Sequence, residues 1–237
     1  MKREDVIKFI RNVKNPEKFL QYCERYHELD FRDIAYVVSR SVVSRDPDNI
    51  NFVLAGAKNM IVTWNIAGYQ RLPRQDKKRL EKDILKAYEA VEGKLKMLRG
   101  KRLESLNLNN KVLEGDIKKV FREFSSRRSI GVTGASKVLH VVNPQVFMMW
   151  DTRIRKAYHK LHESRHKIGS PECYLEFLKQ SQDIIKALLT KTSEDDLWIN
   201  HKAALDKNFI SAFGFKESVL KMLDECNFVR FKLGIRL

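Results

Sequence analysis

Four of the five prolines follow a residue whose side chain can cap the start of a helix. These pairs are Asn15-Pro16, Asp46-Pro47, Asn143-Pro144 and Ser170-Pro171. The capping oxygen accepts a hydrogen bond from a backbone amide that has no partner within the helix, and proline has no amide to leave unpaired. The pairs therefore predict helices near 16–28, 47–68, 144–149 and 171–190.

Apolar residues recur at helical spacing in most of the remaining chain. This periodicity predicts helices near 76–99, 111–124, 197–213 and 217–223, and one more that begins at about Thr152. Only residues 227–233 alternate well enough to be a strand. Because the loops between these helices are short, we expect an all-α fold in a two-lobed helical array. The central lobe would comprise about 47–150, and the second lobe about 1–46 with 151–237.

The net charge is the strongest general indication of function. Lys and Arg number 46 and Asp and Glu 30, which gives a formal charge of +16. Cations gather in residues 71–79, 94–102, 118–128 and 153–160, and the last ten residues add three more without an acid. Such a field attracts polyanions, and nucleic acid is the usual partner. The alternative is a basic, well-solvated surface with no partner.

Other classes of protein are not favoured. We expect no membrane span, because no apolar run approaches the ~18 residues required, and the charged N-terminus does not resemble a secretory signal. The three cysteines, Cys23, Cys173 and Cys226, have no zinc or disulfide spacing. We expect no metal, since the histidines at 159, 162 and 166 are interleaved with lysine and arginine. The predicted location is cytoplasmic and nucleoid-associated, or nuclear.

The most informative segment is residues 129–158, SIGVTGASKVLHVVNPQVFMMWDTRIRKAY. Gly131 and Gly134 form a turn that opens a helix, and backbone amides at such a turn can bind phosphate. Arg127 and Arg128 stand just before this turn. Asp151 then follows four large apolar residues at the start of the next helix, where the helix dipole favours a carboxylate. The side chain of Asp151 is suited both to capping that helix and to catalysis.

The order of turn, apolar helix and Asp-Thr resembles the helix-hairpin-helix DNA glycosylase superfamily, which includes endonuclease III and the 8-oxoguanine and alkylated-base glycosylases. GVTGASK takes the place of the family's hairpin, and WDTRIRK that of its segment with the catalytic aspartate. The resemblance implies a helix-hairpin-helix motif, Asp151 as the catalytic carboxylate and Lys137 as a nucleophile, with Ser136 as the alternative occupant of the lysine position. Arg153 replaces a histidine of the family. The iron–sulfur cysteines of some members are absent, so we expect no cluster and no other cofactor.

The resulting hypothesis is a DNA glycosylase that excises a modified or mismatched base, with or without an associated lyase step. Cleavage of an N-glycosidic bond develops positive charge on the sugar, which a carboxylate stabilises, and the base must leave the duplex for a pocket. The expected base pocket is Trp64, Phe147 and Trp150, and the expected DNA contacts are Arg127, Arg128, Gly131, Gly134, Ser136 and Arg153. The alternative is a non-catalytic DNA- or RNA-binding protein in which Asp151 only caps a helix.

Overall fold

The computed structural model describes residues 2–29, 33–162, 165–205 and 216–237. These residues form helices, turns and loops, and none of them lies in a β-strand, so the predicted all-α class is confirmed. The chain divides into two compact units, which we call unit 1 (residues 1–31 with 151–237) and unit 2 (residues 32–150). None of the described helices combines the length and the apolarity needed to cross a membrane.

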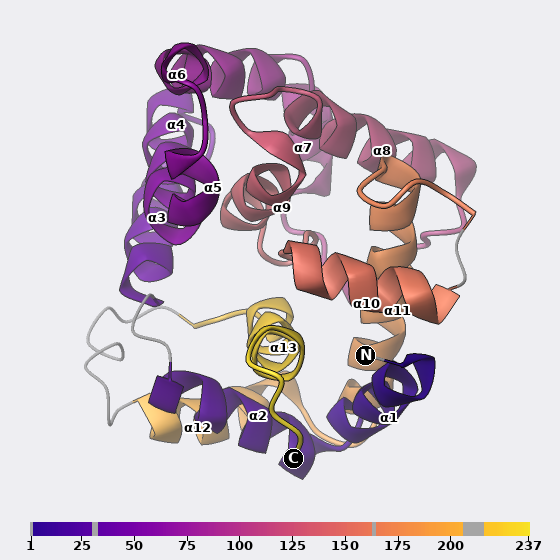
Figure 1. The fold of residues 1–237 in the computed structure, drawn as a ribbon. Helices are drawn as coiled ribbons and strands as arrows, with labels where there is room; N and C mark the ends of the chain where they lie inside the picture. Colours follow the sequence, from indigo (N-terminus) through magenta and orange to yellow (C-terminus); the bar gives the residue numbers. More distant parts are fainter. Residues whose placement is uncertain (1, 30–32, 163–164, 206–215) are drawn as a thin grey trace. The chain divides into compact units, whose positions relative to one another are not determined.

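Unit 2 is built around one buried helix, α9 (Gly131–Val142). Every residue of α9 from Gly134 to Val142 is buried, and the helix contacts its neighbours α3, α4, α8 and η1 (Figure 1). The other elements of the unit are α3 (Asp33–Arg45), α4 (Ile50–Asn59), the π-helix η1 (Met60–Trp64), α5 (Ile66–Gln70), α6 (Arg74–Glu89), α7 (Glu92–Leu98), the 3-10 turn η2 (Leu103–Ser105) and α8 (Lys111–Ser125). The three buried polar residues of α9, Ser136, Lys137 and His140, each have a hydrogen-bond partner.

Helix α3 lies in unit 2 because it packs closely on α4. Gly56 of α4 faces α3 so tightly that an added Cβ atom would lie 2.7 Å from the Ser39 carbonyl oxygen. The lobe predicted from about 1–46 with 151–237 placed residues 33–45 with the chain ends, whereas the structure places them in unit 2. The close approach of the α3 backbone to α4 at Gly56 keeps α3 in unit 2. Such an approach leaves no periodic pattern in the sequence.

Unit 1 joins the two ends of the chain. It contains α1 (Arg3–Val13), α2 (Pro16–Leu29), α10 (Thr152–His162), α11 (Pro171–Leu189), α12 (Glu194–Leu205), α13 (Val219–Asn227) and the π-helix η5 (Phe228–Lys232). Helix α2 packs on both α12 and α13, and α1 packs on α10 (Figure 1). The buried apolar faces of these helices supply the core of the unit.

Several predicted helix bounds are correct and others are wrong. Ser170 caps α11, with its Oγ accepting a hydrogen bond from the Cys173 amide at 3.3 Å. The helix predicted from 47 begins instead at Ile50, capped by Asn49, and the helix predicted near 76–99 is broken between α6 and α7. Residues 206–213, expected to be helical, lie outside the described residues.

Two segments adopt a different structure from the one predicted. Residues 144–149 form a turn and an extended stretch rather than a helix. Five consecutive residues here, 146–150, are buried. The Asn143 side chain, expected to cap a helix, instead donates to the Leu98 carbonyl at 2.9 Å. The one candidate strand, residues 227–233, is not a strand. Its first residue is the last of α13, and the next five form the π-helix η5.

Candidate functional site

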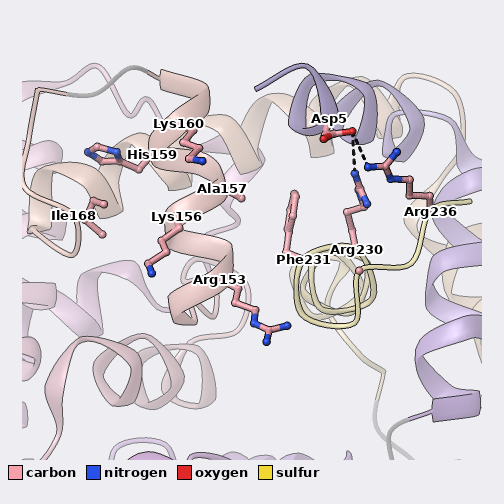
Figure 2. Close-up of a pocket in the computed structure, with 11 residues that line it drawn as sticks. Asp5, Arg153, Lys156, Ala157, His159, Lys160, Ile168, Arg230, Phe231 and Arg236 are labelled. Atoms are coloured by element: carbon pink, nitrogen blue, oxygen red, sulfur yellow. Dashed lines mark ion pairs between the residues drawn. The ribbon is translucent and has the colours of Figure 1, made fainter. Parts of the chain in front are cut away.

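A strongly basic pocket of about 560 Å³ lies in unit 1. Figure 2 shows its walls, which are α10 on one side and α1 with the C-terminal segment on the other. The residues that line it include five lysines and arginines but only one carboxylate. The lining residues are Asp5, Arg153, Lys156, Ala157, His159, Lys160, Ile168, Arg230, Phe231, Gly234 and Arg236.

Helix α10 supplies three of these cations because its two faces differ in polarity. Ile154, Ala157 and Tyr158 are buried, so Arg153, Lys156 and Lys160, which lie three and four residues apart, share the exposed face. The helix begins at Thr152 because Asp151 caps it.

Asp151 uses one oxygen atom for this cap. Its Oδ1 accepts hydrogen bonds from the backbone amides of Arg153 at 2.8 Å and Ile154 at 2.9 Å. Its Oδ2 lies 3.7 Å from the Nζ of Lys232, and 17% of the side chain is exposed. The carboxylate is therefore a helix cap that keeps one oxygen for a nearby cation.

The C-terminal segment supplies the opposite wall. Arg230 and Arg236 both pair with Asp5 of α1, at 3.6 Å and 3.3 Å (Figure 2). The pKa of Asp5 is lowered, first by the hydrogen bond from the Lys2 amide and further by these two arginines. Arg153 donates from Nη1 to the carbonyl oxygen of Lys232 at 2.5 Å. These contacts hold the two walls in place. The lining still carries more positive than negative side chains, which suits an anionic ligand.

The predicted phosphate-binding turn of Gly131 and Gly134 is wrong, because Gly131 begins α9 in unit 2 and Gly134 lies buried inside that helix. Gly131 has a left-handed φ of 64°, which explains the need for glycine there. The amides of Ile130 and Gly131 donate to the Arg127 carbonyl, at 3.0 Å and 2.8 Å. Arg128 pairs with Asp76 at 3.1 Å and Arg127 lies 3.8 Å from Asp83. Two of the three predicted DNA-contacting arginines, Arg127 and Arg128, therefore already have acidic partners within unit 2.

Lys137 and Ser136 lie side by side in the buried helix α9 but have different partners. The amine of Lys137, which is 6% exposed, donates to the carbonyl oxygen of Trp64 at 3.1 Å. That carbonyl belongs to η1, and a π-helical turn often accompanies a functional feature. Ser136 donates to Thr133 O at 2.9 Å and accepts from the Trp150 amide at 2.9 Å. The structure therefore brings Lys137 and Trp64 together, whereas the Ser136 hydroxyl holds the backbone of Trp150 in place.

The three aromatic residues expected to form a base pocket lie in the interior of unit 2. Phe147 and Trp150 are fully buried, and Trp64 is 6% exposed. Trp64 packs edge-on against Tyr36 at 5.6 Å between ring centroids, and Trp150 packs on Phe121 at 6.0 Å. None of the three lines the basic pocket, which belongs to unit 1.

A second polar cluster, which the sequence reasoning missed, is buried in unit 1. It consists of His27, His201, Glu217 and Glu225, whose donor atoms all lie within 4.8 Å of one another. Nothing in the local spacing of these residues indicates a site, because they come from α2, α12, the segment before α13 and α13. The sequence did indicate the pocket cations, since Arg153, Lys156 and Lys160 form one of the charge clusters and Arg230 and Arg236 belong to the basic C-terminus.

Comparisons of the chain with known protein families, with curated proteins and with solved structures found no match.

Proposed function

We propose that the protein binds DNA through the basic pocket of unit 1 and excises a base with Asp151 as the essential carboxylate. The observation that carries the proposal is the excess of cations in a pocket lined by α10, the helix that Asp151 caps. Phosphate groups are the ligands that such a surface attracts most strongly, with release of counterions from the nucleic acid. The resemblance of residues 129–158 to helix-hairpin-helix glycosylases adds the reaction class.

The environment of Asp151 supports a role for its negative charge. Two backbone amides donate hydrogen bonds to Oδ1, while Oδ2 is 3.7 Å from the Lys232 amine. A carboxylate held in this way can stabilise positive charge that develops on a sugar, or orient an attacking water. The hydrogen bond from Lys137 to the Trp64 carbonyl supports water, rather than this amine, as the nucleophile.

The test uses duplex oligonucleotides, each with one altered base, followed by alkali and gel analysis. We expect the parent chain to cleave at one of the altered bases. Asp151→Asn retains an oxygen acceptor for the two amides, so the helix cap is kept while the charge is removed. We therefore expect this variant to bind DNA as the parent does and to lose excision. Asp183→Asn, at an exposed acid of α11, is the matched control and should excise normally.

Borohydride trapping decides whether an amine takes part. A covalent adduct in the parent that disappears in Lys137→Ala would establish a lysine nucleophile. Excision without an adduct would establish hydrolysis. Full excision by Asp151→Asn would contradict the role given to the carboxylate.

A second candidate function is non-catalytic binding of DNA or RNA. The observation in its favour is the cap itself, because the hydrogen bonds of Asp151 to Arg153 and Ile154 account for an aspartate at this position. Salt-dependent binding without a product on any altered base would select this alternative.

A further inference from the structure

The buried cluster in unit 1 combines the donor atoms that divalent transition metals prefer. Two imidazoles and two carboxylates converge there, from His27, His201, Glu217 and Glu225. All four residues are more than nine-tenths buried. Buried charges in proteins are paired or bind metals, because an isolated charge loses its hydration.

The distances within the cluster match the size of a metal site. His201 Nε2 lies 3.0 Å from Glu217 Oε2 and 3.7 Å from Glu225 Oε2, and His27 Nε2 lies 3.3 Å from Glu225 Oε2. A tetrahedral zinc ion with bonds of about 2.0–2.1 Å holds its ligand atoms roughly 3.3 Å apart. The three distances of 3.0–3.7 Å bracket this separation, and all four donor atoms lie within 4.8 Å of one another.

The local charge also calls for a cation. Glu225 Oε1 accepts a hydrogen bond from the Lys221 amine at 2.5 Å, so that one of the two negative charges is offset by a buried lysine. In the metal-bound state both imidazoles are neutral ligands, so two carboxylates and Lys221 leave one negative charge for the ion to offset.

The hydrogen-bonding inventory leaves donor atoms for a ligand. Within the described part of unit 1, Glu217 Oε1, Glu225 Oε2 and His201 Nδ1 make no hydrogen bond. Buried polar atoms nearly always have a partner, so each such atom needs an explanation. A metal ion bound to Oε2 of Glu225 supplies that explanation. Oε1 of the same residue would still accept the hydrogen bond from Lys221, which would then orient a metal ligand from outside the site.

We propose that His27, His201, Glu217 and Glu225 form a closed structural site for one divalent transition-metal ion, with zinc as the best fit. Four protein ligands of mixed nitrogen and oxygen type are typical of zinc, and a site with no open position is structural rather than catalytic. A neutral imidazole binds a metal through the nitrogen that carries no proton, so binding through His201 Nε2 places the ring proton on Nδ1. The ion would join α2, α12 and α13, which the apolar core already packs together.

The first test measures metal binding by the full chain, with any affinity tag removed and DNA absent. Chelator-treated protein is titrated with Co²⁺ as a spectroscopic probe. We expect the visible absorption of tetrahedral cobalt to saturate at one equivalent, to disappear when Zn²⁺ is added, and to persist in excess Mg²⁺. With free Zn²⁺ at a hundredfold excess over its dissociation constant, the midpoint of thermal unfolding should rise by roughly 5–10 °C.

Paired variants locate the ion. Glu217→Gln keeps the side-chain volume but removes a ligand charge, and it should weaken cobalt binding at least tenfold. Glu114→Gln is the matched control, since Glu114 is also a buried glutamate but lies in unit 2; it should bind cobalt as the parent does. If Glu217→Gln does not fold, the parent titration still decides the question.

Three results would overturn the proposal. The folded parent would bind no Co²⁺ or Zn²⁺ at one equivalent, or Mg²⁺ would displace the cobalt. Alternatively, the cobalt spectrum would carry the near-ultraviolet band of a thiolate ligand, which would place the ion on the cysteines. Because none of these measurements involves DNA, their outcome is independent of the proposed base excision.

Discussion

Removing two pocket lysines should change how DNA binding depends on salt. Lys156 and Lys160 are exposed on α10, one helical turn apart, and both line the basic pocket of unit 1. They are better targets than the pocket arginines, because Arg230 and Arg236 pair with Asp5 and so hold the C-terminal wall. Alanine is the strongest helix former, so Lys156→Ala/Lys160→Ala should leave α10 intact.

The size of the effect follows from counterion release. Each phosphate contact contributes about 0.9 to the slope of log affinity against log salt. Two lost contacts should therefore make the slope shallower by about 1.8. Between about 50 and about 200 mM salt, the parent should lose roughly twelvefold more affinity than the variant.

The assay is fluorescence anisotropy with a labelled duplex at several salt concentrations. Lys186→Ala/Lys202→Ala removes the same charge from exposed lysines of α11 and α12 that do not line the pocket. This control should keep the slope of the parent. Equal slopes for the pocket variant and the parent would refute the assignment of the pocket as the phosphate-binding surface.

Three further predictions concern stability. Gly56→Ala should lower the free energy of unfolding by about 1–3 kcal/mol, because the new Cβ would lie 2.4 Å from Val43 Cγ2; Gly93→Ala, whose Cβ meets nothing within 4 Å, is the control, and an equal response of the two in chemical denaturation would contradict the close packing of α3 on α4. Ser136→Ala should cost about 1–3 kcal/mol in the same assay, since it leaves the buried Trp150 amide without its acceptor, and a cost near zero would show that the contact does not brace residue 150. Burial raises the pKa of both Cys23 and Cys226 in the folded chain, so the stability that these thiols contribute is complete below the unfolded thiol pKa of about 8.5 and is lost as the pH rises above it. Under reducing conditions the free energy of unfolding should therefore fall between about pH 7.5 and about pH 10, and it should fall more steeply in the parent than in Cys23→Ala/Cys226→Ala. Equal slopes for the two proteins would contradict this reasoning.

The sequence was a good guide wherever the signal was local. Helical periodicity and capping residues predicted the all-α class and the starts of α2 and α11, because caps and amphipathic faces depend on residues within a few positions of each other. The charge pattern also pointed to α10 and the C-terminus, which line the pocket together. The predictions failed at residues 144–149 and 227–233, where tertiary burial outweighs local propensity.

What the residues do at the candidate sites was harder to predict. The spacing of Lys137 showed that it could lie near the start of a helix, but only the fold placed its amine against the carbonyl of Trp64. From the sequence, Trp150 and Phe147 were candidates either to line a cavity or to fill the core. The structure buries both side chains in the core of unit 2.

The sequence by itself determined that this chain is helical, basic and equipped with an aspartate that begins a helix. Only the tertiary structure decided which cations share a pocket and that two histidines and two glutamates from distant segments meet inside unit 1. The physical reason is that hydrogen bonds and caps within a helix involve near neighbours, whereas a buried polar cluster or a pocket wall is assembled by packing between helices that the order of residues does not reveal.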